Sequence, residues 1–234
     1  MQKNFQFSPI GFIKTPYKEK FGIPRQSGLV MASESIIELN SPYDDPSIVK
    51  GLESFSHIWL IFVFHAPKHD KWKASVRPPR LGGNKRLGVF ATRSPFRPNP
   101  IGMSAVELKK IEIKKGKILL HLAGADLLDG TPILDIKPYI KECDVIKKAQ
   151  EGWLKNSLHS TLKVKYSPLA KLFLKDKTDL KKLITQIIKQ DPRPRYQENT
   201  NECYAFRLKE YDVHFSVTDN IAQIEILSDR PSLK

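Results

Sequence analysis

Two arginines in a proline-rich stretch are the residues of this sequence best suited to chemistry. Residues 88–108 read GVFATRSPFRPNPIGMSAVEL and place Arg93 and Arg97 among three prolines. A guanidinium group binds a carboxylate or a phosphate through two parallel hydrogen bonds. Proline restricts the backbone, so less conformational freedom is lost when a ligand binds. The stretch therefore predicts a stiff loop that presents cations to an anionic ligand.

The charge of the chain favours a nucleic-acid partner. Its 234 residues include 39 Lys and Arg against 25 Asp and Glu, for a net charge of +14. No acidic residue lies between Asp70 and Glu107, so this window carries one sign of charge whatever its fold. Such a window suits a polyanion, and we favour nucleic acid over an anionic membrane surface. Its cations are Lys71, Lys73, Arg77, Arg80, Lys85, Arg86, Arg93 and Arg97.

A second arginine-proline stretch lies near the end of the chain. Residues 191–196 read DPRPRY. Guanidinium groups bind phosphates and a tyrosine ring can stack on a base, so this stretch suits nucleic acid, although a structured interdomain surface is the alternative. From the acid-free window and this second stretch we predict substrate contacts at Arg86, Arg97, Asn99, Arg193, Arg195 and Tyr196.

Three carboxylates follow one another closely and allow several interpretations. Asp126 and Asp129 lie in the segment ADLLDGTP, and Asp135 comes shortly after it. Asp-Gly is a strong turn former, and residue types alone favour a turn. A metal site would need further oxygen ligands, and no EF-hand spacing is present. A carboxylate that binds a small polar ligand is the third possibility.

Three other segments carry polar groups at expected loops. Residues 24–26 (PRQ) are either an exposed loop or a proline-stiffened binder of a carboxylate or base edge. His65 ends a predicted strand, where binding residues often collect. Residues 81–88 are glycine-rich, but they match neither GxGxxG nor a P-loop and give no support for a Rossmann site.

Short strands are expected to position these groups. From about residue 5 to 140 the sequence alternates apolar and polar residues between Gly and Pro signals. This pattern predicts a barrel or a sandwich. Residues 58–64 are apolar throughout and should be buried on both faces, and residues 46–55 show a weak helical period. The predicted strands are residues 7–13, 29–37, 58–64, 87–91, 104–113, 117–122 and 132–138.

The end of the chain has a different composition. Residues 162–166 alternate like a strand, and Ser167-Pro168 has the form of a helix start. A second helix should begin with Thr178 or Asp179 as its cap and stop before Pro192. Predicted strands follow at residues 203–208, 211–217 and 221–227. We therefore divide the chain into a mainly β domain (1–145), a linker (146–159) and a small α+β domain (160–234).

Composition indicates the cellular compartment and the kinds of partner expected for the protein. The longest apolar run is far shorter than a bilayer span, and the first residues lack the pattern of a signal peptide. Cys143 and Cys203 lie far apart with no CxxC partner, so we predict reduced thiols and no zinc site. These features favour a cytoplasmic protein with no metal and no membrane partner.

Several of these motifs together resemble one family. The sequence is similar to the TrmO family, also called YaeB or TsaA-like, over nearly its whole length. The resemblance implies a single-sheet β-barrel, unlike the Rossmann methyltransferases, and a homodimer. It also implies S-adenosylmethionine-dependent methylation of N6 of threonylcarbamoyl-adenosine at position 37 of threonine tRNA. The matching motifs are residues 17–26, 52–57, 76–83, 88–108, 126–132, 135–139 and 191–196.

The resemblance further implies a set of S-adenosylmethionine contacts, which favours ligand binding over a plain turn at Asp126. Asp126, Asp129 and His65 are candidates for a general base, and solvent or the substrate's own carboxylate are alternatives. All the cofactor motifs precede residue 155, so a chain ending there should still bind the cofactor. The implied contacts are Pro24, Arg25, Gln26, His65, Ala66, Arg93, Asp126, Leu127, Leu128 and Asp129.

Two other functions compete with the methyltransferase. A basic RNA-binding protein without catalysis would use the same cationic window. A metal-dependent phosphodiesterase would instead gather Asp126, Asp129 and Asp135 around a divalent ion.

Overall fold

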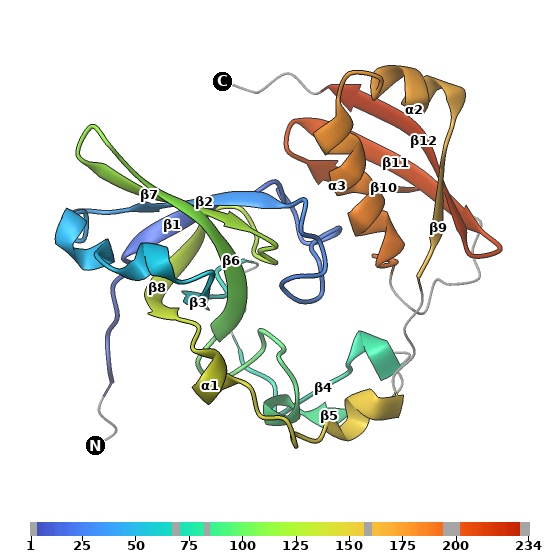
Figure 1. The fold of residues 1–234 in the computed structure, drawn as a ribbon. Coiled ribbons are helices and arrows are strands. Elements are labelled where there is room, and N and C mark those ends of the chain that lie inside the picture. Colours follow the sequence, from blue (N-terminus) through green and yellow to red (C-terminus); the bar gives the residue numbers. More distant parts are fainter. Residues whose placement is uncertain (1–3, 67–70, 82–84, 157–160, 194–201, 230–234) are drawn as a thin grey trace.

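The protein consists of a closed β-barrel and a smaller sheet covered by helices (Figure 1). The computed structural model describes residues 4–66, 71–81, 85–156, 161–193 and 202–229. The barrel is built from the amino-terminal strands, and the smaller sheet from strands that follow residue 162. This architecture confirms the predicted fold class, a mainly β barrel followed by a small α+β unit.

Six antiparallel strands close the barrel in the order β1-β2-β7-β6-β3-β8. Alternate residues point inward, and side chains such as Ile13, Leu60 and Leu120 have no exposed surface. Each such burial contributes about 1.5–3 kcal/mol. The strands are β1 (Gly11–Lys14), β2 (Glu34–Leu39), β3 (His57–Val63), β6 (Ile101–Lys114), β7 (Lys117–Ala123) and β8 (Thr131–Pro138).

Two predictions about this half were wrong in detail. Strand β3 is not buried on both faces, because Trp59, Ile61 and Val63 point to the half-buried outer side of the barrel. The predicted helix at 46–55 is a pair of 3₁₀ turns, Pro46–Val49 and Leu52–Ser54, separated by a glycine in the left-handed region.

The first two predicted strands are also displaced. Predicted strand 7–13 lies mostly before β1, and predicted strand 29–37 begins five residues before β2. Residues 15–33 therefore form a long connection, which we call the β1–β2 loop. Two fully buried side chains of this loop, Tyr17 and Val30, belong to the core of the smaller sheet.

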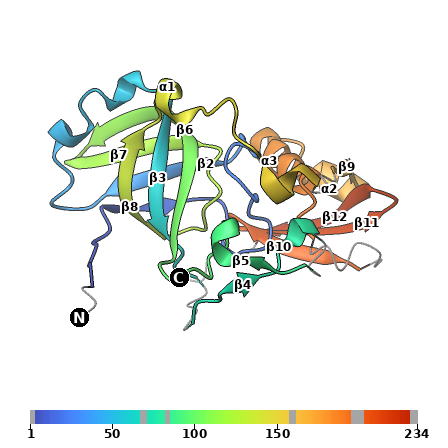
Figure 2. The ribbon, with the colours of Figure 1, turned by 90° about the horizontal axis from the view of Figure 1, so that it is seen from below.

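Residues 71–81 and 85–100 form a segment that projects from the barrel, and we call it the projecting segment (Figure 2). It carries most of the acid-free window. It contains the short strands β4 (Ser75–Val76) and β5 (Leu87–Gly88), which pair antiparallel. The predicted strand at 87–91 stops after two residues and continues as the 3₁₀ turn Val89–Ala91. The Trp153 indole donates a hydrogen bond to the Ala91 carbonyl, so the stretch predicted as a linker contacts this segment.

The smaller sheet has four strands in the order β10-β11-β12-β9, and together with helices α2 and α3 it forms what we call the carboxyl-terminal unit. Helix α2 follows a Ser167 cap and begins at Pro168, which confirms the predicted helix start. Helix α3 follows Lys177, so Thr178 is its first helical residue rather than its cap. The elements are α1 (Lys141–Asp144), β9 (Lys163–Tyr166), α2 (Pro168–Phe173), α3 (Thr178–Lys189), β10 (Tyr204–Leu208), β11 (Tyr211–Thr218) and β12 (Ile221–Asp229).

The predicted boundaries at residues 145 and 160 stay a prediction. The two cores meet at the β1–β2 loop, which leaves the barrel and packs on the smaller sheet. Within the described residues, no helix is long and apolar enough to cross a membrane.

Candidate functional site

A cavity of about 480 Å³ opens at one end of the barrel, between the β1–β2 loop and the arginine-proline stretch. Sites for small molecules usually measure about 300–1,000 Å³. Five separate segments of the chain contribute its walls, which are Lys20, Ile23, Pro24, Arg25, Gln26, Ser27, Phe62, Phe64, His65, Ala66, Thr92, Arg93, Pro95, Arg97, Ile101, Gly102, Met103, Ser104, Asp126, Leu127, Leu128 and Thr131.

Most of the residues singled out from the sequence meet at this cavity. The loops that carry them are far apart in the chain, and the barrel brings them to one rim. Of the implied cofactor contacts, only Asp129 does not line it; of the predicted substrate contacts, Arg97 does. The residues brought together are Pro24, Arg25, Gln26, His65, Ala66, Arg93, Arg97, Asp126, Leu127 and Leu128.

Asp126 is a carboxylate held inside the cavity wall. The Ser104 hydroxyl donates a hydrogen bond of 2.7 Å to its Oδ1 atom. Burial raises the pKa of Asp126, and the Ser104 bond, backbone hydrogen bonds and the nearby Arg93 charge oppose that rise. A raised pKa makes an ionised carboxylate a stronger base. Asp126 thus combines access to the cavity with a basicity above that of an exposed aspartate.

Ser104 is a site residue that the sequence analysis missed. It lies at a buried position of β6, between the inward-facing Gly102 and Val106. A serine at an otherwise apolar inward position was the available signal, because a buried hydroxyl needs a hydrogen-bond partner. The neighbouring Gly102 also has a local reason, since a methyl group there would overlap the Phe62 ring.

His65 is half-buried and lies in the cavity wall, two residues after the end of β3. Burial lowers the pKa of His65, and the charge of Asp129 opposes that change. The imidazole is therefore neutral at pH 7, with one ring nitrogen able to accept a proton.

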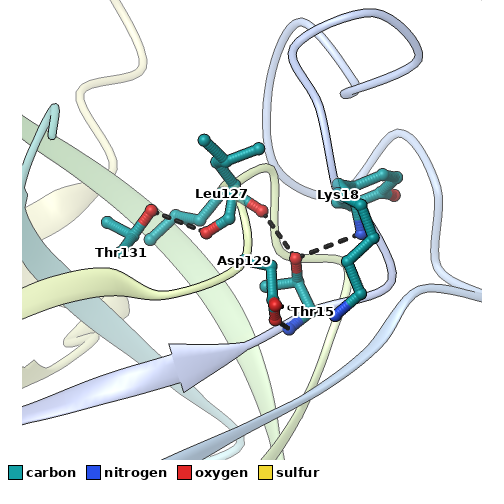
Figure 3. A network of polar contacts seen from close by, with 7 residues as sticks. Thr15, Lys18, Leu127, Asp129 and Thr131 are labelled. Carbon is teal, nitrogen blue, oxygen red and sulfur yellow. Dashed lines mark hydrogen bonds and ion pairs between the residues drawn. The ribbon is translucent and has the colours of Figure 1, made fainter. Parts of the chain in front are cut away.

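Asp129 has a different position from the one expected. Its carboxylate accepts hydrogen bonds from the Thr15 backbone (2.8 Å) and from Lys18 (2.6 Å), as Figure 3 shows. The Thr15 hydroxyl donates to the Leu127 carbonyl, and the Thr131 hydroxyl to the Leu128 carbonyl. These contacts tie the start of the β1–β2 loop to the segment that carries Asp126.

The predicted substrate contacts are distributed over three environments. Arg97 donates to the Thr92 carbonyl (2.8 Å) at the cavity, and Arg86, on the projecting segment, donates to Ser75 (3.1 Å). Asn99 is exposed and does not line the cavity. Arg195 and Tyr196 lie outside the described residues.

Arg193 has a buried environment. It is 5% exposed, and it binds the carboxylate of Asp191 through two hydrogen bonds of 2.8 and 3.0 Å. The structure therefore places this arginine in an internal ion pair, and Arg193 does not line the cavity.

The three aspartates of the phosphodiesterase alternative do not form a metal site. Asp135 pairs with Lys137, whereas Asp129 binds Thr15 and Lys18. In the part of the chain that the structure describes, no group of three His, Cys, Asp or Glu residues is placed to hold a metal ion. The geometry disfavours that alternative.

Comparisons with known proteins agree with this fold. Family models match residues 12–145 to the tRNA-methyltransferase O N-terminal domain and residues 159–230 to the TrmO C-terminal domain. The chain is 44% identical over 234 residues to a tRNA (adenine(37)-N6)-methyltransferase of Escherichia coli strain K12, covering 97% of this chain and 99% of the relative. It is 45% identical to a protein of the same name from Eikenella corrodens, covering 74% and 96%.

Solved structures give the same result. A crystal structure of TrmO from Pseudomonas aeruginosa superimposes with a TM-score of 0.81 at 34% identity, covering 98% of this chain and 99% of that one. The similarity thus extends through the barrel and the smaller sheet. On these matches, the chain belongs to the tRNA-methyltransferase O family.

Proposed function

We propose that this protein transfers a methyl group from S-adenosylmethionine to N6 of the adenine at position 37 of tRNA, with threonylcarbamoyl-adenosine of threonine tRNA as its substrate. The family and the names of the relatives from E. coli and E. corrodens support the reaction. Relatives from P. aeruginosa and Pyrococcus abyssi are named for S-adenosylmethionine. The observation that carries the proposal is the convergence of Arg25, Arg93 and Asp126 on one cavity.

The cavity fits S-adenosylmethionine in its chemistry. Arg25 and Arg93 lie on two different loops at its wall and suit a carboxylate, and Asp126 suits an ammonium group or ribose hydroxyls. Phe62 and Phe64 provide an apolar surface for a ring. Pro24, Gln26, His65, Ala66, Leu127 and Leu128 complete the set that would hold the cofactor. When bound, the cofactor supplies an activated methyl group on a sulfonium.

The protein's own task is to align the substrate and to remove a proton. Methylation of N6 releases the proton that this nitrogen carries, and the carboxylate of Asp126, which lines the cavity, is our first candidate to accept it. Its raised pKa favours that transfer, and Ser104 orients it. Alignment in a fixed geometry lowers the barrier further. His65 is neutral and is the second candidate for the same proton.

The projecting segment suits the anticodon loop. Its cations include Lys73, 4.4 Å from the Phe96 ring centroid, and Arg97, 5.8 Å from that of Phe90. Trp72 and Phe90 are exposed, and aromatic rings on a basic surface stack unpaired bases. Arg25 and Arg97 are the candidates for the carboxylate of the threonyl group. The cytoplasm, where tRNA is modified, and the homodimer implied by the resemblance complete the proposal.

Mass spectrometry of threonine tRNA after incubation with S-adenosylmethionine tests the proposal. We expect one added methyl group on the threonylcarbamoyl-adenosine and none on the same tRNA without the threonylcarbamoyl group. Without the threonyl carboxylate, a half-buried arginine of the cavity loses a charge-assisted hydrogen bond worth about 1.5–3 kcal/mol, so discrimination should exceed tenfold in kcat/KM. Binding of tRNA without methylation would favour the RNA-binding alternative, and comparable rates on both tRNAs would contradict carboxylate recognition. Light scattering of the purified protein tests the homodimer.

A further inference from the structure

The β1–β2 loop belongs to the cavity and to the smaller sheet at the same time. Its residues Pro24, Arg25 and Gln26 line the cavity. Its two ends are bound by the carboxyl-terminal unit, because Lys209 donates its backbone N–H to the Pro16 carbonyl (2.7 Å) and the Ala32 N–H donates to Gln186 of α3 (2.9 Å).

Apolar contacts define the path of the loop between these ends. The Phe21 ring packs against Phe206 and Phe215, with ring centroids 6.1 and 6.4 Å apart. Gly22 has φ +91°, and a Cβ atom there would lie 2.7 Å from the Phe206 ring. The loop therefore follows the surface of the smaller sheet closely, and Figure 1 shows it reaching from the barrel toward α3.

Arg25 is also held from the carboxyl-terminal side. Its Nη2 atom donates to the Asp191 carbonyl (3.0 Å), although Arg25 lines the cavity. Asp191 follows α3 with a positive φ of 47°, and the ion pair with Arg193 fixes its side chain. Both members of that pair are at least 95% buried. A rigid, buried group thus positions a cavity arginine.

We propose that the carboxyl-terminal unit is a positioning part of the cofactor site, an inference that rests on the proposed function. It holds the β1–β2 loop in its binding conformation before the cofactor arrives, so binding orders few additional groups. Gln186, Glu19 and Asp191 are positioning residues in this scheme. Weakening the contacts between the β1–β2 loop and the carboxyl-terminal unit should raise KM for S-adenosylmethionine. It should leave kcat at saturating cofactor within about twofold, because Asp126 and Arg93 are unchanged.

The test uses full-length variants of Gln186, which does not line the cavity. Gln186→Leu removes the acceptor of the Ala32 N–H, and the loss of one hydrogen bond predicts about fivefold weaker S-adenosylmethionine binding by calorimetry. Gln186→Glu keeps an acceptor and should bind within about twofold of the wild type. Glu19→Ala removes the tie to the Arg207 N–H from an exposed position, and it should weaken binding in the same direction without loss of a core contact.

Thr185→Val is the matched control. Thr185 precedes Gln186 on α3, and its hydroxyl lies 2.7 Å from the Tyr166 hydroxyl, within the carboxyl-terminal unit. It should leave cofactor affinity unchanged even if the melting temperature falls. Wild-type affinity in both folded Gln186→Leu and Glu19→Ala would overturn the inference, and so would equal losses in Thr185→Val. Absence of S-adenosylmethionine binding by the wild type would overturn the proposed function, and this inference with it.

Discussion

The two arginine-proline stretches resemble each other in sequence and differ in environment. Arg93 and Arg97 lie beside a cavity in a segment without acids, whereas Arg193 is 5% exposed and paired with Asp191 two residues earlier. One local carboxylate separates the two cases. An arginine close in sequence to an aspartate at a helix end can form a local ion pair. An arginine in an acid-free loop can pair only with an anion from another segment of the chain or from a ligand.

Breaking the buried pair should produce the largest effect. Arg193→Ala removes the guanidinium that donates two hydrogen bonds to the buried Asp191 carboxylate, and removal of one partner of a buried ion pair destabilises a protein by about 3–5 kcal/mol. Thermal or urea unfolding measures this loss. Arg97→Ala is the comparison variant, because its half-buried side chain loses one hydrogen bond to the Thr92 carbonyl, which should lower the free energy of unfolding by about 0.5–1.5 kcal/mol. Similar unfolding curves for the two variants would contradict the distinction between the stretches.

For methyl-transfer activity, we expect the larger loss from a substitution in the arginine-proline stretch at the cavity. Arg93→Ala removes a cation from the cavity wall near Asp126, and the loss of a charge-assisted hydrogen bond to a bound carboxylate lowers the transition-state stabilisation measured by kcat/KM by about 1.5–3 kcal/mol. The melting temperature should stay that of the wild type. Methyl-transfer kinetics and a thermal melt are measured on the same preparation. Full activity in the folded variant would exclude Arg93 from the site.

The pH dependence should locate the base. Burial raises the pKa of Asp126, so the acid limb of kcat/KM should lie at higher pH than for an exposed aspartate. The carboxylate is active when ionised, and activity therefore rises as pH increases through that pKa. Ser104→Ala removes a hydrogen bond that lowers the pKa, so its limb should move to still higher pH while kcat on the plateau stays within about twofold. An unchanged limb would favour His65 or solvent.

The smallest expected effect is on tRNA affinity, from two cations of the projecting segment. Lys85→Glu with Arg86→Glu should weaken tRNA binding and reduce the slope of log K against log salt by about 1–2, through lost counterion release. Both residues are exposed and neither lines the cavity, so methyl transfer at saturating tRNA should persist. Filter binding over a salt series provides the measurement. A slope equal to that of the wild type would exclude this pair from the RNA path.

The structure changes one expectation that the sequence supported. All cofactor motifs precede residue 155, which suggested that the barrel alone would bind the cofactor. The β1–β2 loop, however, contributes Tyr17 and Val30 to the core of the smaller sheet. A chain ending near residue 155 would expose these side chains and release Arg25 from Asp191, so we now expect it to bind the cofactor weakly.

Local features were determined by the sequence itself. Alternating apolar and polar residues predicted strands at 104–113 and 117–122, and the structure has both within β6 and β7, because neighbouring residues of a strand point to opposite sides. Ser167-Pro168 started α2, and Asp219-Asn220 made the turn between β11 and β12, since both depend on short-range hydrogen bonds and backbone preferences. The acid-free window also follows from the sequence alone.

Long-range partners were decided by the tertiary structure. Residues 29–33 have the composition of a strand, but they pack on another unit instead of extending β2. Asp129 resembles a cavity residue and binds Thr15 and Lys18. The burial of Arg193 and the contact between Ser104 and Asp126 likewise join groups that local preference does not bring together. Such contacts depend on which surfaces meet when the barrel closes and the second unit docks, and their free energy arises only after that assembly.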